Sequence, residues 1–152
     1  MRNLSVCLLC FLLWGCGHDG EFQDCLDAAY ISISPNNDFK AAIPFYDKAI
    51  ALRPDYANAY NNRGALYIQT GETDRGIADL NKAIQLNPSD AMAYANRAMA
   101  YRKKGEEQKA RADLDKATSL DPKVQTSSIN LRISDVSPVI QFKVVDGKIV
   151  KE

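Results

Sequence analysis

Apolar residues recur at helical spacing through the middle of the chain, from residue 23 to residue 124. One segment places Tyr60, Leu66 and Tyr67 on a single face. The segment that follows it has the same periodicity, with apolar residues at Ile77, Leu80, Ala83 and Ile84. Apolar positions three or four residues apart are typical of amphipathic α-helices. The pattern therefore predicts pairs of short helices, each with one apolar stripe to bury.

The pattern has a fixed period. Pro54, Pro88 and Pro122 are equally spaced, and each closes a similar run: KAIALRP, KAIQLNP or KATSLDP. Because proline cannot continue a helix, each one ends a unit and sets the turn to the next. One hairpin cannot bury both of its faces, whereas three stacked hairpins share a continuous core. The units, called repeats one, two and three here, run over 23–56, 57–90 and 91–124.

The spacing and columns of this pattern resemble the tetratricopeptide repeat family, whose period is about 34 residues. Repeats two and three match it at Tyr60, Gly64, Tyr67, Gly71, Gly76 and Ala83, and at Tyr94, Ala98, Tyr101, Gly105, Ala110 and Ala117. Repeat one departs from it, with Leu26, Tyr30, Ile33 and Asn37 at the first four of these positions. Terminal repeats are expected to be atypical. The resemblance implies an all-α solenoid of three helical hairpins, in which the tyrosine stripe belongs mostly to the core.

The C-terminal tail, residues 125–152, lacks a helical period. It carries β-favouring runs at 129–133, 139–145 and 148–151. Asp146-Gly147 is typical of a two-residue hairpin turn, so we expect a β-hairpin over 139–151. Repeat arrays usually end in a polar capping helix, and the tail predicts none. We expect an exposed apolar side on the last repeat helix, and a tail that docks on it or pairs with another chain.

Residues 1–15 form a separate segment. Arg2 precedes the apolar run LSVCLLCFLLW, which is too short to span a bilayer and fits a signal peptide. The LWGC sequence that ends at Cys16 resembles the lipobox of bacterial lipoproteins. In that family the signal is cleaved before the cysteine, whose thiol then carries a diacylglycerol. The resemblance implies a lipid on Cys16, and Gly17 after it favours the outer membrane of a diderm, with the protein facing the periplasm.

Other interpretations of the N-terminus remain open. The segment is alternatively an ordinary secretory signal with a coincidental cysteine, or an uncleaved stretch without a targeting role. Cys7 and Cys10 form a CxxC inside the apolar run, but no second ligand pair lies nearby. Without a lipid on Cys16, a Cys16–Cys25 disulfide becomes available in an oxidising compartment. Residues 16–22 are predicted to link the anchor to the repeats.

Composition excludes several classes of function. The 19 Lys and Arg residues balance 19 Asp and Glu residues, so the basic excess of a nucleic-acid-binding protein is missing. His18 is the only histidine, and the sequence has no Ser/His/Asp set, HExxH motif or Gly-rich phosphate loop. A metal site would need clustered His or Cys. We therefore expect no catalysis, no cofactor and no metal.

The family resemblance implies a concave groove lined by the first helix of each repeat. Its outward positions in repeats two and three are Asn58, Asn61, Asn62, Ala65, Gln69, Met92, Ala95, Asn96, Met99 and Lys103. An amide donates and accepts hydrogen bonds at once, so Asn62 and Asn96, at equivalent places, can hold a peptide backbone. The alternative is a solvated helix face. Asp24 and Asp27 stand where carboxylate-binding members of the family need a lysine, which argues against a receptor for chaperone tails.

These observations together predict a membrane-anchored adaptor or scaffold for protein–protein interactions in the bacterial envelope. Such a protein is similar to tetratricopeptide lipoproteins that assist assembly of envelope machines, such as pilus or secretion pilotins. Two alternatives stay open: a soluble chaperone-like scaffold without a lipid, and a protein that self-associates through its C-terminal end. Lipidation of Cys16 separates the first hypothesis from the second.

Overall fold

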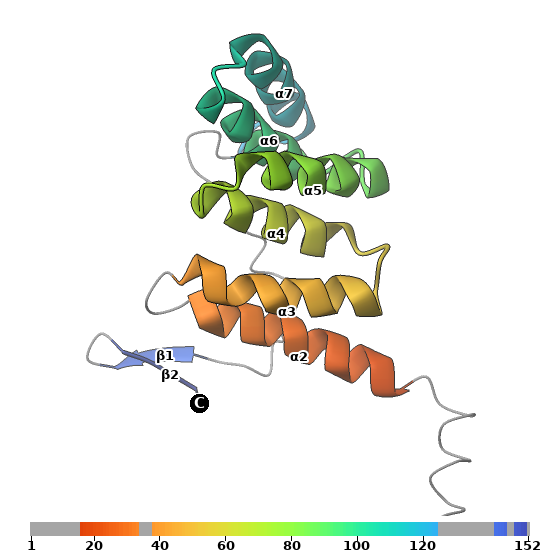
Figure 1. Cartoon of the computed structure of the whole chain (residues 1–152), viewed down its shortest axis with the longest axis vertical. Coiled ribbons are helices and arrows are strands. Elements are labelled where there is room, and N and C mark those ends of the chain that lie inside the picture. Colours follow the sequence, from red (N-terminus) through yellow and green to blue (C-terminus); the bar gives the residue numbers. More distant parts are fainter. Residues whose placement is uncertain (1–15, 34–37, 125–141, 146–147, 152) are drawn as a thin grey trace, which may run out of the picture.

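The computed structural model describes residues 16–33, 38–124, 142–145 and 148–151. In this part of the chain six helices precede two short strands. They are α2 (Cys16–Ile33), α3 (Phe39–Leu52), α4 (Ala57–Gln69), α5 (Thr73–Leu86), α6 (Ala91–Lys103), α7 (Glu107–Leu120), β1 (Phe142–Val145) and β2 (Lys148–Lys151). Consecutive helices pair as three hairpins stacked along one axis (Figure 1). The predicted all-α solenoid of three hairpins is confirmed.

Tight glycine turns join the two helices of repeats two and three. Gly71 has a φ of 90° and Gly105 a φ of 77°. Glycine adopts this left-handed backbone without the clash that a Cβ would cause. Across each turn, the amide of Glu72 donates to the carbonyl of Tyr67 at 2.7 Å, and that of Glu106 donates to Tyr101 at 2.9 Å. The predicted turns therefore lie at the predicted glycines, whereas Asn37, the expected counterpart in repeat one, lies outside the described residues.

The core runs through the stack in two clusters. The first joins α2, α3 and α4 and includes Phe22, Leu26, Tyr46, Leu66 and Tyr67. The second joins α4, α5 and α6 and contains Ile68, Leu80, Ala83, Ala93 and Ala100. Because both clusters take residues from neighbouring repeats, no hairpin completes its core alone. Each repeat boundary is thus part of the core.

The prediction that residues 16–22 form a linker is wrong, because these residues belong to α2. Phe22 is only 3% exposed, and its ring packs edge-on against Tyr56 with the ring centroids 5.0 Å apart. The guanidinium carbon of Arg53 lies 4.6 Å from the Phe22 ring centroid. Asp19 lies in the first turn, where a negative charge favours a helix start. The first repeat helix therefore begins at Cys16, ahead of the predicted repeat boundary at residue 23.

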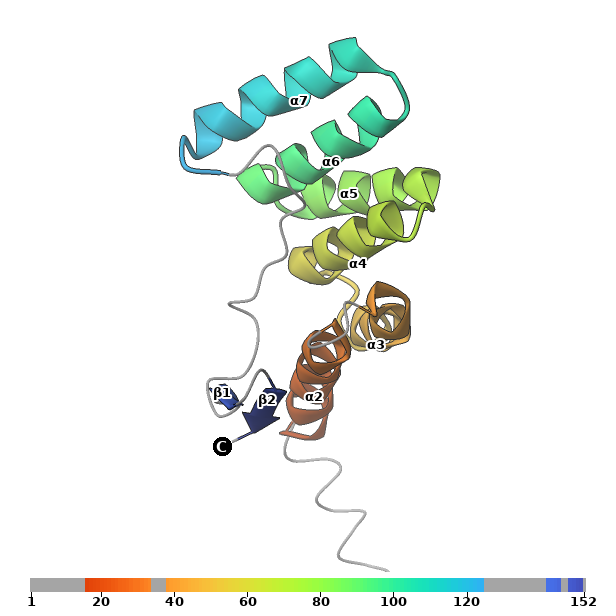
Figure 2. The ribbon, with the colours of Figure 1, turned by 90° about the vertical axis from the view of Figure 1, so that its left-hand side faces the viewer.

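Two strands lie within the segment predicted as a hairpin. β1 and β2 pair antiparallel, with Phe142 opposite Lys151 and Val145 opposite Lys148. In Figures 1 and 2 this pair lies at the α2 end of the stack. The predicted signal peptide, residues 1–15, and the run 129–133 lie outside the described residues. Within the described ranges, no helix is both long enough and apolar enough to cross a membrane.

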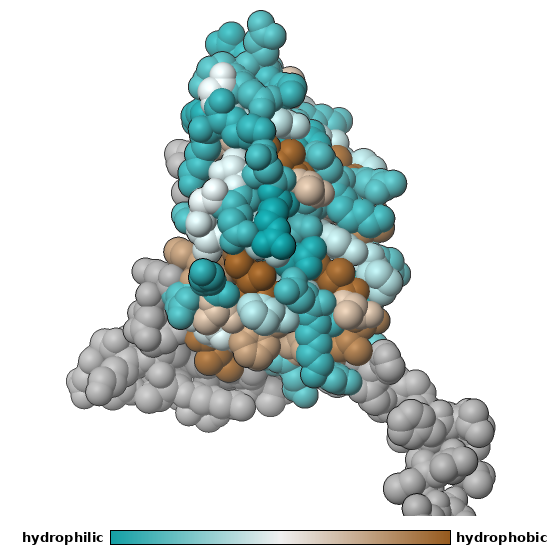
Figure 3. All heavy atoms as spheres, in the orientation of Figure 1, coloured by the Kyte–Doolittle hydropathy of each residue, from teal (hydrophilic) through white to brown (hydrophobic). Residues whose placement is uncertain are grey.

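Among the described residues, the large hydrophobic side chains that are exposed belong to repeat one. Ile31 on α2 is 46% exposed and Phe45 on α3 is 36% exposed. Figure 3 shows hydrophobic residues gathered over this end of the stack, whereas the third repeat is mostly hydrophilic. On α7, Arg111 and Thr118 are exposed, and Leu114 is half-buried. The expected apolar outer side of the last helix is therefore wrong, because polar residues replace most of its apolar stripe.

Helices α4 and α5 approach closely where two glycines face each other. A Cβ added to Gly76 would lie 2.7 Å from the carbonyl oxygen of Gly64 and 2.7 Å from Cγ1 of Ile68. A backbone carbonyl cannot rotate aside as a flexible side chain can. Repeat three has Ala98 and Ala110 at the two glycine positions, so this contact between backbones is particular to repeat two.

We expect Gly76→Ala to lower the free energy of unfolding by about 1–3 kcal/mol, because the added methyl overpacks the contact. This loss outweighs the helix propensity that alanine gains over glycine, about 1 kcal/mol. Gly20→Ala is the control, since a Cβ there has no neighbour within 4 Å. It should leave stability unchanged or raise it. Urea unfolding followed by circular dichroism measures both, and a Gly76→Ala variant as stable as the wild type would contradict the close approach.

Candidate partner-binding face and the polar network behind it

The predicted partner-binding residues lie on α4 and α6, which contact each other directly. We call the side of the stack formed by α2, α4 and α6 the first-helix face; these helices can be followed in Figure 2. Five of the predicted residues are exposed or half-buried on it: Asn58, Gln69, Met92, Met99 and Lys103. Ala65 and Ala95 are fully buried, so their prediction as outward residues is wrong.

Asn61, Asn62 and Asn96 form a buried chain of side-chain amides. Asn96 Nδ2 donates to Asn61 Oδ1 at 3.0 Å, and Asn61 Nδ2 donates to Asn62 Oδ1 at 3.2 Å. Asn62 Nδ2 then donates to the Tyr46 hydroxyl at 3.2 Å. The three asparagines are 0–2% exposed, so the prediction that they face outward is wrong. Buried amides require such partners, and this chain links α6, α4 and α3 across all three repeats.

Two arginines tie together the helices of repeats two and three. Arg63 on α4 donates from Nε and Nη2 to the two carboxylate oxygens of Asp79 on α5, at 2.7 and 2.8 Å. Arg97 on α6 makes the same paired contact with Asp113 on α7, with both bonds at 2.7 Å. Paired arginine–carboxylate bonds fix orientation as well as adding energy. Both arginines therefore lie at the packing seam between the two helices of their hairpin.

Each arginine also reaches the preceding repeat. Arg63 Nη1 donates to Asp47 Oδ1 at 2.6 Å, and Arg97 Nη1 donates to Asn81 Oδ1 at 2.7 Å. The hydrogen bond to Asp79 raises the pKa of the Arg63 guanidinium above its ordinary value, so this cation stays charged at every pH at which the protein folds. One arginine thus joins three helices from two repeats.

Tyrosines flank these guanidinium groups. The guanidinium carbon of Arg63 lies 5.8 and 5.9 Å from the ring centroids of Tyr60 and Tyr67. In repeat three the corresponding distances from Arg97 to Tyr94 and Tyr101 are 5.5 and 5.8 Å. Cations at this distance from aromatic faces are attracted to them. The tyrosine stripe therefore helps to position the arginines, in addition to filling space.

Charge differs between the two ends of the first-helix face. On α2, Asp24 is exposed, while Asp27 is buried and accepts a hydrogen bond from Gln23 at 3.0 Å. The last turn of α6 is basic, with Arg102 and Lys103. The ammonium group of Lys103 donates to the carbonyl of Ile68 at 2.9 Å, which holds it against α4. The face is thus acidic on repeat one and basic on repeat three.

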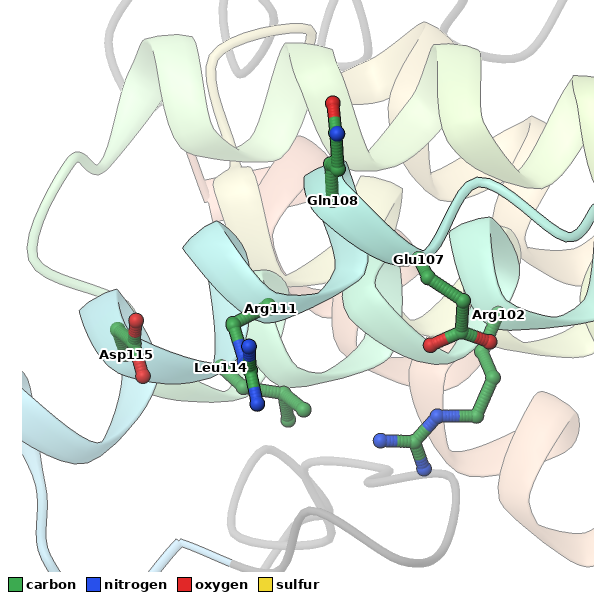
Figure 4. Close-up of a pocket in the computed structure, with 6 residues that line it drawn as sticks. All are labelled: Arg102, Glu107, Gln108, Arg111, Leu114 and Asp115. Carbon is green, nitrogen blue, oxygen red and sulfur yellow. The ribbon is translucent and has the colours of Figure 1, made fainter.

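The described residues offer few other candidates for a reactive, metal-binding or ligand-binding site. Cys25 is a free, buried cysteine, and burial raises the pKa of its thiol. No group of three or more His, Cys, Asp and Glu residues in the described ranges could hold a metal ion. A pocket of about 500 Å³ lies beside α7 and is lined by residues of α7 and by Arg102 at the end of α6 (Figure 4).

We expect Asp79→Asn to lower the free energy of unfolding by about 1–3 kcal/mol, because it leaves the half-buried Arg63 with an uncompensated donor. Asp74→Asn makes the same chemical change in an exposed pair with Lys104, where the Asp74 side chain is 83% exposed. Exposed pairs contribute little, so this control should unfold like the wild type. Equal unfolding midpoints for both variants in urea would show that the arginine contacts do not hold the hairpin together.

Three family models match the repeats. One, described as TPR repeat, matches residues 36–71, and two, described as tetratricopeptide repeat, match residues 57–90 and 80–112. No curated protein matches the chain.

Solved structures with the same fold include several tetratricopeptide repeat (TPR) domains. The TPR domain of Arabidopsis OM64 is 24% identical, with a TM-score of 0.68 over 72% of this chain and 90% of that one. The second TPR domain of human RPAP3, in complex with the HSP70 peptide SGPTIEEVD, is 23% identical, with a TM-score of 0.67 over 72% and 91%. The TPR2B domain of yeast Sti1, in a complex with pHsp70, is 28% identical, with a TM-score of 0.65 over 69% and 83%. With its three matching repeats and its stack of paired helices, this chain belongs to the tetratricopeptide repeat family.

Proposed function

We propose that this protein is a protein–protein interaction adaptor that binds an extended segment of a partner on its first-helix face. The observation that carries the proposal is the buried amide chain from Asn96 through Asn61 and Asn62 to Tyr46. It fixes the first helices of repeats two and three relative to each other and to repeat one. A face that is already ordered loses less conformational entropy on binding. The yeast Sti1 domain, 28% identical, is in a complex with pHsp70, which supports the same mode of use.

The charges of the face define the partner segment further. A uniformly acidic tail would meet the exposed Asp24 on α2, and like charges at an interface cost affinity. A segment with basic residues toward α2 and acidic residues toward Lys103 suits both ends. On α6, Met92 and Met99 are half-buried and offer adaptable apolar contact. The preferred partner is therefore an extended segment that carries both signs of charge.

The proposal includes a tether to the bacterial envelope through a lipid on Cys16, facing the periplasm. Because Cys16 is the first residue of α2, a lipid on it would attach directly to the first repeat without a flexible spacer. Each buried CH₂ of an acyl chain contributes about 0.8 kcal/mol to membrane binding, so two or more chains anchor stably. The alternatives remain a soluble chaperone-like scaffold and a self-associating one, both without a lipid.

The binding face can be located by crosslinking in the cells that make the protein. A photoreactive benzoylphenylalanine at exposed Gln69 on α4, or at Met99 on α6, should form a discrete crosslinked product. The matched control replaces another exposed glutamine, Gln85 on α5, outside the first-helix face, and should give no such product. Equal crosslinking from Gln69 and Gln85, or none from Gln69 and Met99, would refute binding on this face.

The tether is tested by the intact mass of protein purified from membranes. The wild type should have lost residues 1–15 and gained acyl chains on Cys16. Cys16→Ala should abolish both changes. Cys25→Ala is the control and should keep the wild-type modification, because Cys25 is buried. An unmodified wild-type mass would exclude the lipid and leave the soluble scaffold as the hypothesis to pursue.

A further inference from the structure

The pocket beside α7 (Figure 4) lies at the end of the described stack that α7 forms (Figure 1). Its lining residues come from the end of α6 and from α7: Arg102, Glu107, Gln108, Arg111, Leu114 and Asp115. Each stands one full repeat period after one of the following in repeat two: Ile68, Thr73, Asp74, Ile77, Leu80 and Asn81. The pocket is therefore the repeat-three counterpart of a surface in repeat two. We call it the terminal seat.

In repeat two the corresponding surface holds α6. Arg97 donates to Asn81 at 2.7 Å, Lys104 pairs with Asp74 at 2.6 Å, and Lys103 donates to the Ile68 carbonyl at 2.9 Å. The apolar part of the contact is one core cluster, whose members from the two sides include Ile68, Leu80, Ala93 and Ala100. In repeat two, helix α6 thus packs on the surface that corresponds to the terminal seat. The pocket of about 500 Å³ in repeat three therefore lies where one more helix would pack.

The chemistry of the terminal seat differs from its counterpart at two places. Arg102 and Arg111 stand where repeat two has Ile68 and Ile77. Leu114 keeps the apolar character of Leu80, and Figure 4 shows it beside Arg111, with Arg102 and Glu107 across from them. The terminal seat is therefore a charged version of a helix-binding surface, with a small apolar centre.

Asp115 occupies a position with a fixed use in the rest of the stack. Its counterparts Asp47 and Asn81 each accept a hydrogen bond from the arginine of the following repeat, at 2.6 and 2.7 Å. In the described part of the chain, the side chains of Asp115, Arg102 and Arg111 form no ion pair. An arriving helix can therefore supply a cation for Asp115 and anions for the two arginines.

We propose that the terminal seat binds an amphipathic helix of a partner protein, in the orientation that α6 has against repeat two. Charge complementarity sets the chemistry of this helix. It carries an arginine where α6 has Arg97, to meet Asp115. It carries carboxylates where α6 has Ala93 and Ala100. In repeat two these alanines share an apolar cluster with Ile68 and Ile77, and the terminal seat has Arg102 and Arg111 in place of the two isoleucines. Small residues between these positions allow contact with Leu114.

A second copy of this chain does not meet these requirements. Head-to-tail stacking would place α2 of one copy on the terminal seat of the next. At the position of Arg97, α2 has Ala29, which brings no cation to Asp115. At the position of the small Ala98, α2 has the bulky Tyr30. The occupant is therefore a different protein.

The probe is a fluorescent peptide with the sequence of residues 90–104 and the changes Ala93→Glu and Ala100→Glu. Short helices are marginal in water, so the peptide folds on binding and its affinity is modest. Fluorescence anisotropy with the full chain should show binding that weakens as salt screens the charges. A matched peptide with Ala93→Lys and Ala100→Lys should bind about ten-fold more weakly, because it presents like charges to the arginines.

A charge swap separates the terminal seat from other surfaces. Arg111→Glu should weaken the Glu peptide about ten-fold and strengthen the Lys peptide by a similar factor. Lys116→Glu, an exposed change on the same helix outside the pocket, should alter neither. Crosslinking from Gln69 should survive Arg111→Glu, which distinguishes this site from the first-helix face. Equal affinity of the two peptides, or no response to Arg111→Glu, would overturn the proposal. Wild-type self-association by sedimentation that Arg111→Glu abolishes would overturn it too, in favour of a second copy.

Discussion

The stack depends on one repeated interaction, an arginine that binds its own hairpin and the preceding one at once. Arg63 holds Asp79 with two hydrogen bonds and Asp47 with a third. Half-buried ion pairs add little net stability compared with apolar packing, but their geometry is exacting. A hairpin that slid along its neighbour would break the bond from Arg63 to Asp47, although the bonds to Asp79 within the hairpin would remain. The arginines therefore specify register, while the apolar clusters supply most of the driving force for stacking.

The same interaction explains how polar residues organise the rest of the molecule. With the register fixed, Asn61 and Asn96 meet across α4 and α6 at 3.0 Å and extend a chain of amides to Tyr46. A buried amide chain is stable only when every member is satisfied. The amide chain thus stabilises a single relative placement of the three repeats. Both polar networks point to the same arrangement, which leaves the first-helix face rigid.

The regular spacing of the prolines and the glycine turns predicted the hairpins, because periodicity and turn chemistry are local properties. The start of α2 could not be predicted in this way, since helicity of residues 16–22 depends on Phe22 packing against Tyr56 and Arg53, which come from the end of the same repeat. The prediction that the asparagines face outward was wrong for a related reason. Position in the repeat places Asn62 on the first helix, but only the neighbouring Asn61 and Tyr46 turn its amide into a buried link. Local pattern identifies elements, whereas contacts between elements decide which polar residues stay accessible.

The terminal seat shows how the last helix of the described stack can face solvent. Aliphatic residues at Ile77 and Ile84 of repeat two become Arg111 and Thr118 in repeat three, so the last helix tolerates water on its outer side. The carboxylate that would accept a hydrogen bond from another arginine is nevertheless retained, at Asp115. A surface that tolerates water and also accepts a helix favours reversible binding over permanent stacking. Cys16 begins the first helix, and the terminal seat lies on the last, so the proposed anchor and this surface occupy opposite ends of the stack (Figure 1). A partner helix would then be held away from the membrane, with the first-helix face between the two ends free to bind a second, extended segment.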